Sequence, residues 1–127
     1  MKIRSVFRVI PVPVFYTDRM PAGVGGQARF MLVFIRPKYK EDEGIHQHEL
    51  AHVELFWATL GLKTFIQLFS KKFRIWNEAR AYARQMDFPD AFGHYLTWAE
   101  AAARLAGPHY GFGLTLEQAK RAIFDAY

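Results

Sequence analysis

The sequence predicts an α+β fold in one domain, residues 1–127, with a short N-terminal β-sheet of two or three strands and then four or five helices. Two observations support this prediction. Up to Arg36, β-branched and aromatic residues occur in short runs separated by turn residues, whereas after Gly44 the apolar residues recur at helical spacing. Strands that precede helices in this way are typical of α+β proteins. A chain of 127 residues also fits one domain with one core.

The strand region begins with a run from Ile3 to Tyr16 that contains Pro11 and Pro13. Because proline lacks an N–H for the ladder, this run is expected to form an edge strand or two short strands. The segment Asp18–Gly26 has the glycine and proline content of a turn. The apolar run Ala28–Arg36 then predicts one strand covered on both faces, ending at the proline that follows it.

The helical region is divided by glycine, proline and capping residues. The last helix is predicted most sharply, because Thr115 and Gln118 have the spacing of a capping box. Gly107 follows the preceding helix at the position expected after a C-terminus. The predicted helices are Ile45–Leu60, a second amphipathic segment Leu62–Phe73, Trp76–Met86, Ala91–Ala106 and a last helix running to about Ala126.

The composition excludes several function classes. With 51% hydrophobic and 23% charged residues, the chain is neither disordered nor fibrous. The absence of cysteine excludes a disulfide scaffold, a Cys-ligated zinc site and a thiol nucleophile, so a metal would need His and carboxylate ligands. The net charge of +5 permits contact with nucleic acid, anionic cell wall or an acidic membrane surface without selecting one. No nucleic-acid reading motif is recognisable, so no specific nucleic-acid partner is expected.

The sequence also bears on location. The N-terminal residues interleave charged and apolar side chains and do not resemble a secretory signal. The most apolar later stretch, Val53–Phe69, is interrupted by Glu54, Gly61 and Lys63, so no transmembrane segment is expected. The default expectation is therefore a cytoplasmic protein.

The strongest chemical signal is the HExxH motif His48-Glu49-Leu50-Ala51-His52, which falls inside a predicted helix. Residues four apart lie on one helical face, so both imidazoles can reach one ion. Glu49 projects beside them and can contact a metal-bound water without being a ligand. The alternative is a helix that happens to carry two surface histidines.

A candidate third ligand is Glu78, near the start of the alanine-rich helix that follows. Two histidines and a glutamate are a standard ligand set for catalytic zinc, and they leave the fourth position for water. The small side chains beside Glu78 would let this helix approach the motif helix closely. The alternative is a solvent-facing glutamate paired with Arg80 or Arg74.

HELAH followed by NEARAYA resembles the gluzincin branch of the zinc metallopeptidases, most closely the compact HExxH proteins of bacteria and their phages. The resemblance covers about residues 28–86. It implies a zincin-like fold, Zn²⁺ bound by His48, His52 and Glu78, and Glu49 as general base. The substrate would be a peptide or protein.

The chain departs from the larger gluzincins at one position. Those proteins carry an aspartate four residues after the ligand glutamate, where it orients a zinc-bound histidine, and this chain has Tyr82 there. The group that orients the histidines is therefore expected elsewhere, from Asp87 or a backbone carbonyl.

A peptidase of this type also needs a donor to the oxyanion that forms at the attacked carbonyl. The best candidate is Tyr82, one turn beyond Glu78 on the same helical face. The other candidates share only their position in the C-terminal third of the chain; they are His94, His109 and Tyr110. His46 is expected to point away from the metal and to lie in solvent or in the N-terminal turn of its helix.

Two further expectations concern surfaces. The aromatic run Phe56-Trp57, continued by Phe65, Ile66, Leu68 and Phe69, is expected to belong to the core. The alternative is docking on a membrane surface, helped by Lys71 and Lys72. The strand Ala28–Arg36 is the natural candidate to pair with an extended substrate.

Together these observations predict a zinc-dependent metallohydrolase, a peptidase acting on a protein or a cell-wall peptide. The alternative is a non-catalytic, zinc-stabilised structural or interaction protein, for example a component of a phage particle or another large assembly, which would place the chain in a virion. Glu49 favours catalysis, because a purely structural metal site has no use for a base beside an open coordination position.

Overall fold

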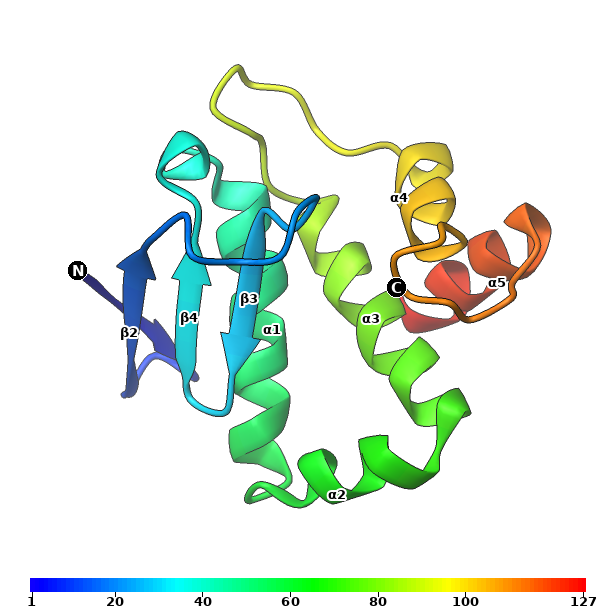
Figure 1. The fold of residues 1–127 in the computed structure, drawn as a ribbon, viewed down its shortest axis with the longest axis horizontal. Helices are drawn as coiled ribbons and strands as arrows, with labels where there is room; N and C mark the ends of the chain where they lie inside the picture. Colours follow the sequence, from blue (N-terminus) through cyan, green and yellow to red (C-terminus); the bar gives the residue numbers. More distant parts are fainter.

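The structure, a computed structural model, describes all residues from Met1 to Tyr127 and is α+β, with an N-terminal sheet followed by helices (Figure 1). Four strands precede five α-helices, and a short 3₁₀ helix, Pro37–Tyr39, lies between them. The strands are β1 (Lys2–Val6), β2 (Ile10–Tyr16), β3 (Gly26–Arg29) and β4 (Leu32–Ile35). The helices are α1 (Glu43–Ala58), α2 (Leu62–Phe69), α3 (Lys71–Gln85), α4 (Trp98–Leu105) and α5 (Leu116–Ala126).

The sheet has four strands in the order β1-β2-β4-β3, one or two more than predicted. The pairs β1–β2 and β3–β4 are antiparallel, and β2 and β4 are parallel. The run Ala28–Arg36 was predicted as one strand, but it contains the turn of the β3–β4 hairpin. Arg29 pairs with Leu32 across a two-residue loop, in which Phe30 has a φ of 55° and reverses the chain.

The proline-containing run forms two short strands, one of the two predicted outcomes. The second of them, β2, is not at an edge of the sheet, since it lies between β1 and β4. Within β2, only Val14–Tyr16 pair with β4, and these residues lie beyond Pro11 and Pro13. The proline stretch therefore has β1 as its single neighbour, which is why the two missing N–H groups are tolerated.

The helix boundaries follow their caps. Asp42 caps α1 by accepting a hydrogen bond from the Ile45 N–H, and Ser70 caps α3 in the same way, so α3 begins at Lys71 rather than at Trp76. The fourth helix was predicted from Ala91, but α4 begins at Trp98, where Thr97 and Glu100 form a capping box. The box of α5 is confirmed. No helix combines the length and apolar character needed to cross a membrane.

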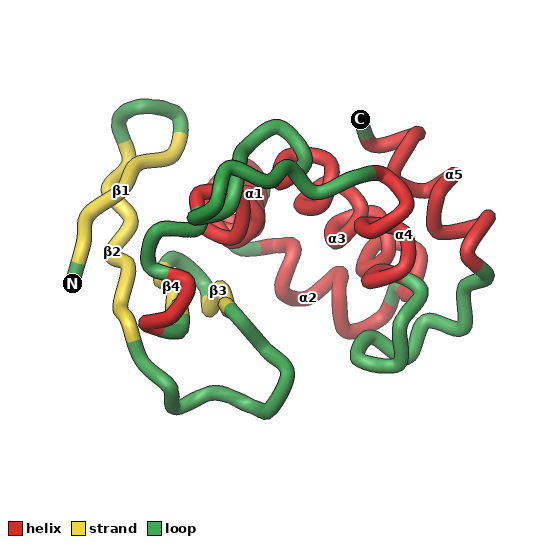
Figure 2. Tube along the Cα trace, turned by 90° about the horizontal axis from the view of Figure 1, so that it is seen from above, coloured by secondary structure: helices red, strands yellow, loops and turns green.

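Helices α1 and α3 pack side by side at the centre of the molecule, with a small core on each side of the pair. In Figure 2 the strands lie at one end, α4 and α5 at the other, and α1 between them. Small side chains favour the close approach of the pair: Ala51 of α1 and Ala81 of α3 are fully buried, whereas Ala79 and Ala83 belong to the core that α3 forms with α4 and α5. Glu54 of α1 accepts a hydrogen bond from Arg80 and forms an ion pair with Arg84, both on α3.

The second helix differs most from the prediction. The side chains of the aromatic run were expected in the core, but Phe65, Ile66, Leu68 and Phe69 are exposed, as is Leu62. Phe56 and Trp57, from the same predicted set, are half-buried. The predicted second segment also ends at Phe69, because the chain turns at Ser70 and Phe73 belongs to α3.

Candidate metal centre

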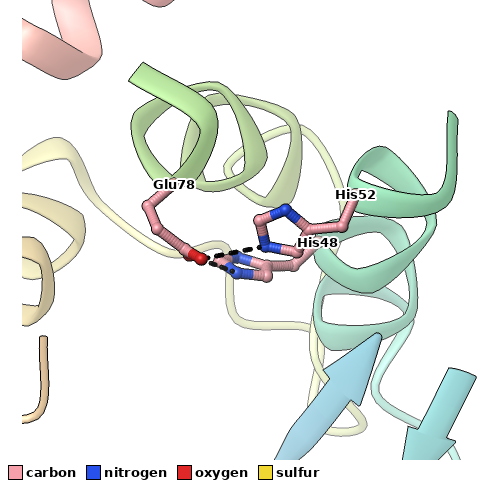
Figure 3. Close-up of side chains that lie close together, drawn as sticks. All are labelled: His48, His52 and Glu78. Carbon is pink, nitrogen blue, oxygen red and sulfur yellow. Dashed lines mark ion pairs between the residues drawn. The ribbon is translucent and has the colours of Figure 1, made fainter. Parts of the chain in front are cut away.

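His48 and His52 of α1 face Glu78 of α3 across the centre of the molecule (Figure 3). His48 Nε2 is 3.3 Å from Glu78 Oε2, and His52 Nε2 is 3.3 Å from Glu78 Oε1. One ligand atom from each of the three residues lies within 4.8 Å of the others. Two ligand atoms at 2.0–2.1 Å from a tetrahedral ion are about 3.3 Å apart. The three side chains could therefore hold one metal ion.

Side-chain amides fix the orientation of both imidazoles. His48 Nδ1 lies 3.0 Å from Gln85 Oε1, and His52 Nδ1 lies 3.0 Å from Asn77 Oδ1. An amide oxygen can only accept, so each Nδ1 is the donor and each Nε2 of the neutral ring presents its lone pair. Two such lone pairs and a carboxylate then converge on one point, an arrangement that a cation satisfies.

These amides replace the groups expected from the sequence. Asp87 was a candidate to orient a histidine, but its carboxylate instead accepts a hydrogen bond of 2.6 Å from the Tyr127 hydroxyl. The groups that orient the two histidines are the side chains of Asn77 and Gln85, on the same helix as Glu78. Gln85 comes seven residues after Glu78, a spacing that returns to the same helical face and could have identified it.

The structure does not support the alternatives in which the motif residues are surface side chains. His48 and His52 are not surface histidines, because they are only 7% and 6% exposed. Glu78 does not pair with Arg80, whose guanidinium contacts the Ala51 carbonyl and Glu54. Burial alone would raise the pKa of Glu78, but His52 and His48 hold it well below its usual value.

Glu49 is buried beside the three ligand residues and is not one of them. Burial raises the pKa of its carboxyl to about 7; the carboxylate of Glu78 adds to this rise, whereas His48 opposes it. A Cβ on Gly26 would lie 3.1 Å from Glu49 Cγ, so glycine at this position lets β3 approach Glu49 closely. The Ala28 N–H, also on β3, hydrogen-bonds the carboxylate and favours its charged form.

A buried lysine lies behind the histidines. Lys63 of α2 donates a 2.7 Å hydrogen bond to the backbone carbonyl of His52. Burial lowers the pKa of its ammonium group to about 8, although Glu78 and Glu49 favour the charged form. This residue was not predicted as part of the site, since its sequence context is that of an exposed lysine on an amphipathic helix.

Two tyrosine hydroxyls complete a chain of hydrogen bonds at the ligand glutamate. Tyr110 donates to Glu78 Oε2 at 3.0 Å, and the Tyr82 hydroxyl lies 2.8 Å from that of Tyr110. The Tyr82 ring packs edge-on against the His48 ring, with centroids 4.5 Å apart. Burial raises the pKa of Tyr82 to about 12, and burial and Glu78 also raise that of Tyr110, so both hydroxyls keep their protons at neutral pH.

A cleft of about 660 Å³ opens onto His48 and Glu49. All four residues considered as oxyanion donors line it, but only Tyr82 and Tyr110 belong to the hydrogen-bond chain that reaches Glu78. His94 instead lies 3.1 Å from Glu100. Residues 23–26, the end of the loop before β3 and its first residue, form one wall, and the Arg36 guanidinium donates to the Val24 carbonyl there at 2.6 Å.

His46 lies in the N-terminal turn of α1 and points away from the three ligand residues, but it is buried rather than in solvent. Its Nδ1 lies 2.7 Å from the Asp42 carbonyl and its Nε2 3.2 Å from the Tyr16 hydroxyl. Because both ring nitrogens have partners within the fold, His46 ties α1 to β2.

Comparisons of this chain with protein-family models, with curated proteins and with solved structures found no match. What can be said of its function comes from the motifs and from the geometry of this centre.

Proposed function

We propose that this protein is a zinc-dependent metallohydrolase that cleaves peptide bonds, with zinc held by His48, His52 and Glu78. The observation that carries the proposal is the buried cluster of two oriented imidazoles and one carboxylate, with the separate carboxylate of Glu49 beside it. Two histidines and a glutamate are a standard donor set for catalytic zinc, and they leave one position open. The resemblance of HELAH and NEARAYA to gluzincins, and with it a zincin-like fold, agrees with this assignment.

Glu49 would act as general base and then as general acid. Zinc, when bound, supplies a Lewis acid that polarises the scissile carbonyl and lowers the pKa of water. Glu49 takes the proton from the attacking water and passes it to the leaving amine. In the metal-free protein burial raises the pKa of Glu49 to about 7, and a bound cation would favour the carboxylate form that accepts the proton.

The Tyr82–Tyr110 pair would supply the donor to the oxyanion. Both hydroxyls are protonated at neutral pH and line the same cleft as Glu49. Tyr110 donates its one proton to Glu78, so Tyr82 donates to Tyr110. Tyr82 is the preferred donor, because redirecting its proton to an oxyanion gives up a hydrogen bond between neutral groups, whereas Tyr110 would give up one to a carboxylate.

The free edge of β3 would bind the substrate backbone. The Arg36 N–H donates to the Gly25 carbonyl, so in the antiparallel ladder the alternate residues Gly26 and Ala28 direct their backbone groups to the unpaired edge. Both residues lie against Glu49, and the Ala28 N–H hydrogen-bonds its carboxylate, so a substrate would pair with the other backbone groups of this edge. An extended peptide added there would pass beside the base by β-augmentation.

The proposal is tested by incubating the zinc-loaded protein with a library of unstructured peptides and with cell-wall peptides, and identifying products by mass spectrometry. The matched control is Glu49→Gln, which keeps the shape of the side chain and removes the base. We expect cleavage by the wild type and a loss of about 10²–10⁴-fold in rate for the variant. Equal cleavage by both would contradict the role of Glu49. Zinc binding with no cleavage of any substrate would favour the non-catalytic alternative.

A further inference from the structure

The apolar side of α2 faces solvent. Leu62, Phe65, Ile66 and Phe69 are 59%, 64%, 38% and 87% exposed. They occupy positions i, i+3, i+4 and i+7, so they form one continuous stripe along the helix. We call this stripe the α2 face. A helix on the surface of a globular protein ordinarily turns such a stripe inward, and here no part of the chain covers it.

The orientation of α2 is fixed by a polar residue on its inner side. Lys63 is buried and donates its hydrogen bond to the His52 carbonyl of α1. Rotating the helix to bury the α2 face would break this bond and move the ammonium group. The exposure of the stripe is therefore built into the packing of the helix.

Other apolar side chains extend the α2 face toward the sheet. Leu60, at the corner between α1 and α2, and Phe30, at the tip of the β3–β4 hairpin, are both exposed. The ring of Phe30 packs edge-on against Phe56, with centroids 6.1 Å apart, and Phe56 lies beside Gly61 at the same corner. In Figure 1 the hairpin tip and α2 both lie at the bottom of the molecule.

The charges around this surface have one sign. Between Glu54 and Glu78 the chain has no acidic residue. Lys71 and Lys72, in the first turn of α3, directly follow the stripe; both are exposed, and neither lies within ion-pair distance of a carboxylate. Arg29, next to Phe30 at the hairpin tip, is also exposed.

We propose that the α2 face docks on the surface of an anionic lipid bilayer, with its phenylalanines in the interfacial region and the flanking lysines on the headgroups. A short helix with an apolar stripe and neighbouring cations is the pattern of an interfacial anchor. A second copy of the chain fits this face poorly, because a two-fold contact would bring the same unpaired lysines together. A stripe of four side chains on a helix of eight residues is also small beside the roughly 800 Å² that each partner contributes to a stable protein interface.

The test is co-sedimentation of the purified full chain with vesicles of phosphatidylcholine alone and of phosphatidylcholine mixed with phosphatidylserine. We expect binding to the mixed vesicles that weakens as salt is raised, and little binding to phosphatidylcholine alone. Phe65→Ser and Phe69→Ser should each weaken binding by about tenfold or more. Lys71→Glu and Lys72→Glu should each weaken it by at least about fivefold. Because all four side chains are exposed, these variants should fold, which circular dichroism checks.

The matched control is Phe92→Ser. Phe92 is 94% exposed and belongs to the segment between α3 and α4, which lies at the opposite end of the molecule from α2 in Figure 1. Its loss should leave vesicle binding unchanged. The proposal is overturned by absence of binding to the mixed vesicles, or by equal binding of Phe92→Ser and Phe69→Ser. A dimer in sedimentation analysis that is lost in Phe69→Ser, with no vesicle binding, would assign the face to a second copy instead. None of these results depends on hydrolysis.

Discussion

The side-chain oxygen of Gln85 lies 3.0 Å from His48 Nδ1, so a residue on α3 sets which nitrogen of an α1 histidine carries the proton. Asn77 has the same relationship to His52. One helix thus supplies both Glu78 and the two groups that orient His48 and His52. This arrangement pre-organises the centre before any ion binds.

Removing either amide should weaken metal binding without removing a ligand. We expect Gln85→Leu and Asn77→Leu each to lower zinc affinity by about 10–100-fold, because the freed imidazole can rotate or change tautomer. Competition with a chromophoric chelator measures the affinity. Gln47→Leu is the control, since Gln47 lies on α1 and donates to Glu43 rather than to a histidine. Unchanged affinity in Gln85→Leu would mean that the amide has no orienting role.

The local parts of this architecture could be read from the sequence. The capping box at Thr115 and Gln118 needs only residues three apart, and the HExxH motif needs only helical periodicity. Glu78 could be predicted as the third ligand, because a catalytic zinc site needs three protein ligands and the chain between His52 and Glu78 is long enough to return on a second helix. Each of these inferences depends on one element or on one well-defined chemical requirement.

The predictions that were wrong or missing concern contacts between helices and strands. The turn at Phe30 uses a positive φ in a non-glycine residue, which no local turn signal marks. The outward face of α2 follows from where Lys63 finds its partner, the His52 carbonyl, and periodicity alone does not say which way a stripe points. The amides were missed because no local motif marks Asn77 or Gln85 as a partner of a histidine; only the helical spacing of Gln85 from Glu78 points to it, and the contacts form once α1 packs against α3.

Glu49 should make the metal-free protein less stable as pH rises. Its pKa is raised from 4.5 to about 7 by burial, so the native state holds the proton more tightly than the unfolded state. The stabilisation from this proton is present below about pH 4.5 and is lost as pH rises through about 7, a change of up to about 3 kcal/mol. Gln does not titrate. Urea unfolding should therefore find metal-free Glu49→Gln more stable than wild type near pH 8, with a smaller difference near pH 5. A difference independent of pH would rule out this coupling.

Removing the Tyr82 hydroxyl should slow hydrolysis and leave the centre intact. Loss of one oxyanion donor costs about 10²–10³-fold in kcat. Tyr82→Phe keeps the ring that packs against His48, so zinc affinity should stay within a few-fold of wild type. Steady-state kinetics on a substrate found for the wild type, together with the chelator competition, separates the two effects. An unchanged kcat in Tyr82→Phe would mean that another residue donates to the oxyanion, and Tyr110→Phe would be the next variant to measure.

Zinc should stabilise the fold, because its ligands join α1 to α3. An ion that binds only the native state adds RT ln(1 + [L]/Kd), about 4 kcal/mol at a thousandfold excess over Kd. A chelator should lower the Tm by several degrees at neutral pH. Protons compete with the metal for the imidazoles, so the difference should shrink on acidification. Coincident melting curves at neutral pH, in a sample shown to contain zinc, would place the ion outside the α1–α3 contact.

The most direct test of the account is the metal content of the purified protein after dialysis against zinc, measured by mass spectrometry beside its ligand variants. The account predicts one zinc per chain in the wild type and in His46→Ala, whose imidazole faces Tyr16 and not the centre. It predicts loss of that zinc in His48→Ala, His52→Ala and Glu78→Ala. A wild type that holds no zinc, or a Glu78→Ala protein that keeps the full complement, would contradict it.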